Sequence, residues 1–227
     1  MWLDESIACF NSLQPSICED DMLAISDICK ALHLPQKTLA ISNHIFFAAK
    51  AESKIEPDDV VLISSVINLA CKICETLRPL EKIMHLASKH YSIEIDQSIM
   101  ELYTTSINKT EIELSVVLDF NFEISEIYTR LERLCKEKQF DSVFSRRCWI
   151  MLNDIMQTPL SIYFTIDELL TCTIFTNYVA SELKNEKTMD DVEMYEIFSE
   201  KYKLTTASFS CIEFMSNKLL ELYSTSN

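Results

Sequence analysis

The chain has 227 residues, of which 48% are hydrophobic and none is glycine, and its formal net charge is −15. A chain of this length and apolar content can bury the core of one large domain or two small ones. The lack of glycine excludes glycine-rich phosphate-binding loops and the GxSxG nucleophile turn, because these motifs need a residue without a Cβ atom where the backbone bends tightly.

Three features of the sequence indicate where the protein is found and what it contacts. They are its charge, its cysteines and the length of its apolar runs. A net charge of −15 repels nucleic acid at long range, so we expect no direct nucleic-acid contact. Nine cysteines without dense spacing, and no basic-then-apolar leader after Met1, are typical of reduced intracellular thiols. The longest apolar run, Val60 to Cys74, is shorter than the roughly 20 residues that span a bilayer, so no membrane insertion is expected.

The sequence pattern predicts an all-α fold. Because the chain has no glycine and only five prolines, it lacks the Asn-Gly and Asp-Gly turns that usually connect the strands of a β-hairpin. Apolar periodicity and helix-stop residues predict a first set of five helices near residues 19–33, 35–50, 58–74, 79–91 and 96–119. A second set of five is predicted near 124–137, 141–157, 166–183, 190–201 and 205–224. The segment from Trp2 to Leu13 carries enough apolar residues for an additional short helix.

The two sets of helices resemble each other at an offset of 108 residues. Aligned apolar pairs at this offset are Val61/Leu169, Leu62/Leu170, Val66/Ile174, Ile67/Phe175, Ala70/Tyr178 and Cys71/Val179. A helix that is apolar nearly all round must be surrounded by other helices, so 60–74 and 169–180 are each expected to form the axis of a small bundle. The predicted organisation is an N-terminal segment at 1–18, a first domain at 19–123 and a second at 124–224.

Lys72 is a charged residue inside the first apolar stretch. The second copy has Ala180 at the matching position, so the lysine is not needed to build the bundle. On its own, it fits an ordinary lysine at a helix end whose ammonium group reaches solvent. The alternative is that Lys72 has a function, because it is present in only one of the two copies.

The cysteines and histidines do not predict a metal or cofactor site. Cys71 and Cys74 form one CxxC, but no second pair follows at a zinc-binding spacing, so they are interpreted as core thiols. The four histidines show no i, i+4 pairing and no HExxH motif. We therefore expect no catalytic residue, no metal and no cofactor.

Several segments resemble one protein family. NLACKICE at 68–75 and ELSVVLDFNFEI at 113–124 are similar to the third-helix segment and the fifth-helix ending of the cyclin box. Further similar segments are LHLPQKTLAISNHIFF at 32–47, LRPLEKIMHLASKH at 77–90 and WIMLND at 149–154. The chain thus resembles the cyclins of the transcriptional type, and among them cyclin L. This resemblance implies an all-α fold of two tandem five-helix cyclin boxes with a short N-terminal helix.

The resemblance implies a regulatory subunit and not an enzyme. Cyclins bind a cyclin-dependent protein kinase and hold its αC helix in the active position. By this resemblance, Lys72 and Glu113 correspond to the charged pair on the kinase-facing surface, where Glu113 would accept a hydrogen bond from Lys72. The apolar kinase-contact positions would be Ile73, Leu114, Val117, Phe122 and Ile124. Asn121 stands where cyclins often have glycine after the fifth helix and is expected to take the left-handed conformation there.

The resemblance also implies the partners and leaves alternatives open. The expected assembly is a heterodimer with a cyclin-dependent kinase of transcription or RNA processing, located in the nucleus, with a third subunit left open. Cyclins of the C, H, K and T types are alternative relatives. A DNA-binding factor of the IIB type also uses paired cyclin folds, but it needs a basic face and usually a zinc ribbon. A cyclin-fold scaffold that binds no kinase is the remaining alternative.

Overall fold

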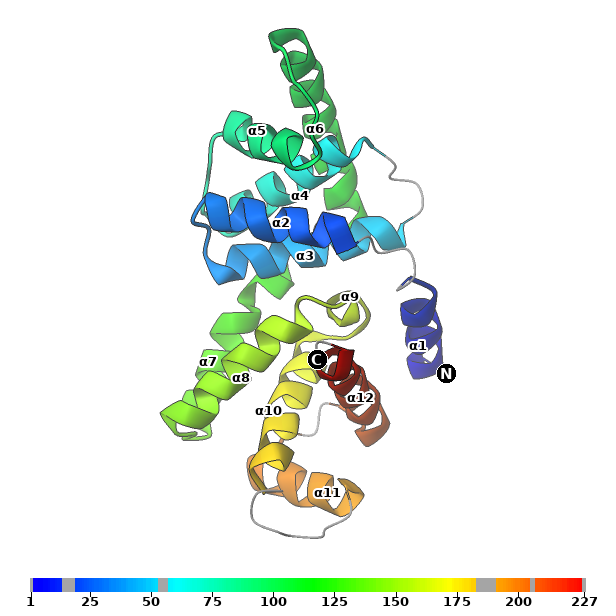
Figure 1. The fold of residues 1–227 in the computed structure, drawn as a ribbon. Helices are drawn as coiled ribbons and strands as arrows, with labels where there is room; N and C mark the ends of the chain where they lie inside the picture. The colour runs from blue at the N-terminus through cyan, green and yellow to red at the C-terminus, as the bar shows by residue number, and fades with distance from the viewer. Residues whose placement is uncertain (1, 14–18, 53–56, 183–190, 205–206, 226–227) are drawn as a thin grey trace. The chain divides into compact units, whose positions relative to one another are not determined.

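The computed structural model describes residues 2–13, 19–52, 57–182, 191–204 and 207–225. These residues form helices and no strand, as the all-α prediction requires (Figure 1). The first helices are α1 (Trp2–Leu13), α2 (Glu19–Ala31), α3 (Gln36–Ala51), α4 (Asp59–Ile73), α5 (Leu80–His90) and α6 (Gln97–Val117). The 3-10 helix η2 (Glu123–Glu126) follows, and then α7 (Ile127–Glu137), α8 (Ser142–Ile155), α9 (Leu160–Tyr163), α10 (Ile166–Glu182), α11 (Asp191–Tyr202) and α12 (Phe209–Thr225). None of the described helices is both long and apolar enough to cross a membrane.

Every helix expected from the sequence is present, with its ends moved by a few residues. The two elements that the periodicity did not predict, η2 and α9, have four residues each, which is too short to show a helical repeat. The chain divides into two compact units, and the division falls between Ser125 and Glu126, close to the expected domain boundary. The first unit is residues 8–125, and the second unit is residues 126–227 together with residues 1–7.

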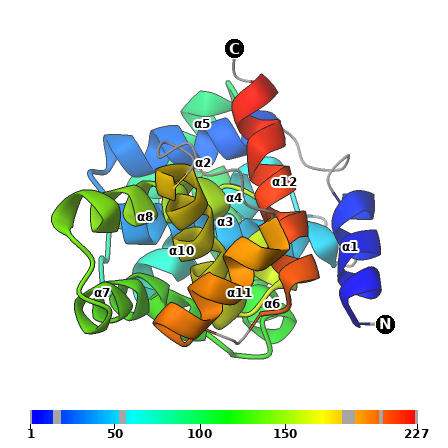
Figure 2. The same cartoon turned by 90° about the horizontal axis from the view of Figure 1, so that it is seen from below.

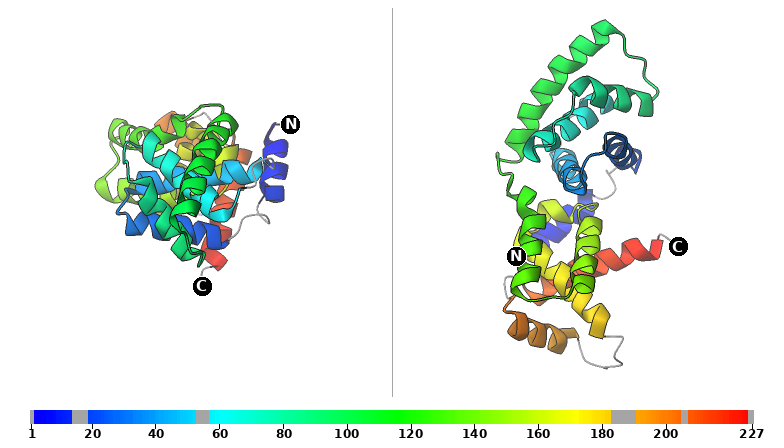
Figure 3. Two further views of the ribbon diagram at one scale, coloured as in Figure 1. Left: turned by 90° about the horizontal axis from the view of Figure 1, so that it is seen from above. Right: turned by 90° about the vertical axis from the view of Figure 1, so that its left-hand side faces the viewer.

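Helix α4 is the central helix of the first unit. It contacts α2, α3, α5 and α6, and each of its residues from Val60 to Cys71 is buried (Figures 1 and 3). Asp58 caps its N-terminus by accepting a hydrogen bond from the Val60 N–H at 3.0 Å. Helix α6 has 21 residues, more than any other described helix, and its N-terminal end extends past α4. The expectation that the first apolar stretch forms a bundle axis is confirmed.

Helix α10 has the same position in the second unit. It contacts α7, α8, α9, α11 and α12. Figure 2 shows α8, α11 and α12 beside it. Leu169, Leu170 and Ile174 are buried, whereas Tyr178 is only partly buried near the end of the helix. The ring of Phe175 lies 5.3 Å from that of Tyr195 and 5.2 Å from that of Phe198 on α11. The second apolar stretch is therefore also a bundle axis.

Among the described helices, five end in a Schellman motif although the chain has no glycine. At the end of α7, for example, the Phe140 N–H donates to the Cys135 carbonyl at 3.0 Å and the Gln139 N–H donates to the Lys136 carbonyl at 3.2 Å. The residues that take the left-handed conformation in these motifs are His33, Glu75, Ser92, Asp119 and Gln139. Each of them carries a Cβ atom that disfavours a positive φ, so the chain ends its helices at a cost that glycine would avoid.

The prediction for Asn121 is wrong. The left-handed residues after α6 are Asp119, with φ 51°, and Phe120, with φ 52°. The side chain of Asn121 instead accepts a hydrogen bond from the Glu123 N–H at 3.0 Å and leads the chain into η2. A bulky residue such as Phe120 is rare at positive φ, and here it follows directly on a second left-handed residue.

We expect Gln139→Gly to raise the free energy of unfolding by roughly 0.5–1 kcal/mol, because relief of the left-handed strain exceeds the entropy that glycine adds to the unfolded chain. The matched control is Arg133→Gly, at an exposed position inside α7, which should lower the free energy of unfolding by about 1 kcal/mol. Urea denaturation followed by circular dichroism measures both changes. An equal loss of stability in the two variants would contradict this account of the helix ends.

Candidate functional site

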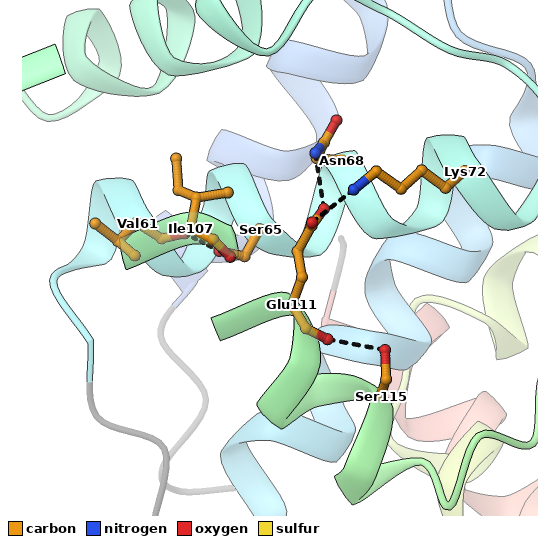
Figure 4. A network of polar contacts seen from close by, with 7 residues as sticks. All are labelled: Val61, Ser65, Asn68, Lys72, Ile107, Glu111 and Ser115. Atoms are coloured by element: carbon orange, nitrogen blue, oxygen red, sulfur yellow. Dashed lines mark hydrogen bonds and ion pairs between the residues drawn. The ribbon is translucent and has the colours of Figure 1, made fainter. Parts of the chain in front are cut away.

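Lys72 lies in the last turn of α4, where the burial of this helix ends. Its side chain is 49% exposed, and its Nζ atom donates to the Oε2 atom of Glu111 at 2.6 Å (Figure 4). Glu111 belongs to α6, and its side chain is only 9% exposed. The pair therefore joins a buried carboxylate to an ammonium group at the surface, and it directs the lysine side chain along the edge of the helix.

Both carboxylate oxygens of Glu111 have partners. Its Oε1 atom accepts a hydrogen bond from the Asn68 amide at 2.7 Å, so one carboxylate joins Asn68 and Lys72, which lie one turn apart on α4 (Figure 4). The Glu111 carbonyl accepts a further hydrogen bond from the hydroxyl of Ser115 at 2.8 Å. A turn earlier on α4, the Ser65 hydroxyl donates to the Val61 carbonyl at 2.7 Å. This network satisfies polar groups that would be costly to bury alone.

The acidic partner of Lys72 was predicted incorrectly. Glu113 is not in this network; it forms an ion pair with Lys109 at 3.5 Å, one turn earlier on α6, and its side chain is 44% exposed. Two residues correspond to about 200° around a helix, so Glu113 and Glu111 lie on opposite sides of α6. Helical spacing could have indicated Glu111 as the partner. It is four residues from Ile107 and three from Leu114, so it lies on the same side of α6 as these two buried residues.

The apolar residues predicted for kinase contact fall into two groups. Leu114 and Ile124 are buried within the described chain, so their side chains are not available at its surface. Ile73, Val117 and Phe122 are partly exposed. The kinase-binding role of all five stays a prediction, but the geometry leaves only the second group able to touch a partner.

A more exposed apolar surface on α6 was missed. Ile112, Val116 and Phe120 are 64%, 60% and 63% exposed, and they recur every four residues along the end of α6 and the turn after it. We call these three residues the α6 stripe. Ile112 directly follows Glu111, so the stripe begins about 100° around the helix from the charged pair. The four-residue spacing could have been found in the sequence, but apolar residues at this spacing are usually assigned to a core.

The thiols near the site are poorly placed for ionisation. Burial raises the pKa of Cys71 above its ordinary value, and it does the same to the partly buried Cys74. In the part of the chain that the structure describes, no group of three or more histidine, cysteine or acidic side chains is arranged to hold a metal ion.

Comparison with known proteins identifies the fold. No protein-family model matches the sequence, and no curated protein matches it. Among solved structures, the chain is similar to a chain in the crystal structure of the yeast RNA Pol II CTD kinase CTDK-1 complex, with a TM-score of 0.69 and 17% sequence identity. The match covers 98% of this chain and 66% of the other, so this chain spans about two thirds of that chain's length. The predicted fold of two tandem cyclin boxes with a short N-terminal helix is confirmed.

We expect Glu111→Ala to lower the free energy of unfolding by roughly 1–3 kcal/mol, because it leaves the Asn68 amide buried without its acceptor. Glu113→Ala is the matched control on the same helix, and it should change stability by no more than about 0.5 kcal/mol, since its ion pair is exposed. Chemical denaturation of both variants measures the difference. Equal stability of the two variants would show that the buried network contributes nothing.

Proposed function

We propose that the chain is a regulatory subunit that binds and activates a cyclin-dependent protein kinase acting in transcription. The observation that carries this proposal is the Lys72–Glu111 pair beside the exposed α6 stripe. The cyclin fold supports it, as does the likeness to a chain from a complex that is a kinase of the RNA Pol II CTD. The chain itself would perform no catalysis.

The α6 stripe has the character of a binding surface. Three large apolar side chains on successive turns, each more than half exposed, are unfavourable in water and gain when a partner covers them. Interface hot spots cluster in well-packed positions from which a partner excludes water. Here the buried Glu111 carboxylate holds Lys72 in one direction, so less side-chain entropy is lost when a partner binds.

The mechanism is a shift of the kinase population. An isolated kinase of this type samples states in which αC is rotated out and the catalytic Lys–Glu pair of its N-terminal lobe is broken. A partner that binds only the αC-in state moves the population from 1:99 to 99:1 when the difference in binding is about 5.5 kcal/mol. An interface of roughly 2,000 Å² provides enough contact for such a difference. In this proposal the stripe packs against αC and Lys72 donates to the backbone beside it.

The finer assignment rests on the similar segments of the sequence. Those at 32–47, 77–90 and 149–154 favour a cyclin L-like protein with a role in RNA processing and a nuclear location. Cyclins of the C, H, K and T types are the alternatives within the same fold. The kinase that the chain binds decides among them, since each branch has its own partner.

We expect Lys72→Ala to weaken kinase binding by about 2–5 kcal/mol, because the Glu111 carboxylate is then buried in the interface without its cation. Val116→Asp should weaken binding at least as much by placing a charge in the apolar contact. Lys30→Ala, at an exposed lysine of α2 that pairs with Asp27, is the control and should bind like the wild type. The measurement is co-purification and titration calorimetry against a panel of co-expressed cyclin-dependent kinases.

Activation is a separate readout from binding. A kinase that binds the wild-type chain should phosphorylate a peptide substrate faster in its presence, and Lys72→Ala should reduce this gain. Binding without activation would favour a scaffold over a kinase regulator. If no kinase of the panel binds, or if Lys72→Ala and Val116→Asp bind as well as wild type, the proposed function is wrong.

A further inference from the structure

The arginines of this acidic chain are concentrated in one hairpin of the second unit. Four of its five arginines lie in α7 and α8, and they are Arg130, Arg133, Arg146 and Arg147. Residues 127–155 hold six basic and four acidic side chains, whereas the whole chain has a net charge of −15. The hairpin is thus a locally positive region in a protein whose overall field is negative.

One side of α8 combines these cations with exposed apolar residues. Val143 and Ile150 each expose more than half of their surface, and Trp149 is 39% exposed. Val143, Arg146 and Ile150 are spaced by three and four residues, so they lie on one side of the helix, and Trp149 borders them. We call Val143, Arg146, Trp149 and Ile150 the α8 face.

Trp149 is held in position before any partner binds. Its ring packs on that of Tyr128, with the centroids 4.7 Å apart, and the Tyr128 hydroxyl donates to the Asn153 Oδ1 atom at 2.7 Å. Because the tyrosine is fixed by its hydrogen bond, the tryptophan resting on it loses little freedom on binding. Tryptophan and arginine are both enriched at interface hot spots, and here they are neighbours on one helix.

A small pocket borders the α8 face. It has a volume of about 210 Å³ and lies between α7 and α8, with Leu131, Phe140 and Trp149 among its lining residues. Lys136 and Glu132, which are joined to each other at 2.6 Å, also line it. This volume is below the roughly 300–1,000 Å³ of ordinary small-molecule sites, so it suits a single apolar side chain better than a cofactor.

The arginines of α8 are available for a partner. Within the described residues, no carboxylate forms an ion pair with Arg146 or Arg147, both of which are exposed. A guanidinium group pairs with a carboxylate through two parallel hydrogen bonds, which gives direction as well as charge. The negative overall charge of the chain repels acidic groups, whereas the arginines of α7 and α8 attract them. An acidic partner would therefore bind at this region in preference to the rest of the surface.

We propose that the α8 face docks an acidic segment of a partner protein, one that carries a large apolar or aromatic side chain. The carboxylates of this segment pair with Arg146 and Arg147, and its apolar side chain enters the pocket beside Trp149. Nucleic acid fits less well, because it carries a charge on every phosphate and is therefore repelled by the whole chain more strongly than a short acidic segment is. The inference goes beyond the proposed kinase regulation, since α8 belongs to the second unit and the α6 stripe to the first.

The first test uses a fluorescein-labelled synthetic peptide that alternates acidic residues with leucine and phenylalanine, titrated with the full chain and followed by fluorescence anisotropy. We expect saturable binding that weakens as ionic strength rises. Two control peptides separate the contributions: one with glutamine at each acidic position, and one with serine at each apolar position. Both should bind at least tenfold more weakly, in line with the loss of a hot-spot contact. Equal binding of all three peptides, or no binding of the first, would overturn the proposal.

The second test uses variants at exposed positions, so that folding is retained, as circular dichroism would verify. We expect Arg146→Glu and Ile150→Ala each to reduce peptide affinity roughly tenfold or more. The matched controls are Lys89→Glu and Leu102→Ala, exposed residues of the same kinds in the first unit, which should leave affinity unchanged.

Three results would overturn the assignment of the α8 face. One is an equal loss of peptide affinity in the control variants. Another is tighter binding of a single-stranded oligonucleotide that depends on Arg146. The third is self-association of the chain that depends on Ile150. None of these measurements involves a kinase, so failure here and failure of the proposed function are distinguishable.

Discussion

The burial of α4 from Val60 to Cys71 is the constraint on which the first unit depends. Polar side chains on such a helix are costly to bury without partners, and α4 carries Ser64, Ser65 and Asn68 among its apolar residues. The Ser64 hydroxyl is buried without a hydrogen-bond partner in the described part of the chain, whereas the other two residues are paired. The Ser65 hydroxyl donates a hydrogen bond to the Val61 carbonyl within α4, but the Asn68 amide needs an acceptor from a neighbouring helix. Glu111 supplies that acceptor, and its second oxygen is then available to Lys72. The same carboxylate thus pairs a polar group of the core, Asn68, and positions the lysine of the candidate site.

The same helix, α6, serves two surfaces. Ile107, Glu111 and Leu114 face the interior, while Ile112 and Val116 are exposed on another side. An ordinary surface helix places charged or polar residues on its outer side, because exposed apolar area gains nothing from folding. The outer side of α6 departs from this rule in its last two turns, next to the charged pair. Such a departure is expected where a second protein completes the burial, since local rules are most often broken at functional sites.

The sequence could predict the helices and the two bundle axes, because long apolar runs and 3.6-residue periodicity are local signals. It could not assign each apolar residue to the core or to a binding surface. Leu114 and Val116 are two residues apart and chemically similar, yet one is buried and the other exposed. Similarity to the cyclin box indicated Glu113 as the partner of Lys72, whereas the geometry of the helix selects Glu111. A resemblance of short segments locates a site to within a turn; the packing of α4 against α6 decides which side chain occupies it.

The left-handed turn after α6 links the missing glycine to the candidate site. Asp119 and Phe120 both have positive φ, and each conformation of this kind costs roughly 1–3 kcal/mol in a residue with a side chain. The Schellman hydrogen bonds from Asp119 to Val116 and from Phe120 to Ser115 hold the turn, but they leave the Phe120 ring 63% exposed. In the free chain, burial of the Phe120 ring therefore offsets little of the free-energy cost of the positive φ at Phe120. A partner that covered the ring would recover about 25 cal/mol for each Å² of apolar surface removed from water, so covering the α6 stripe would offset part of the cost of the strained turn.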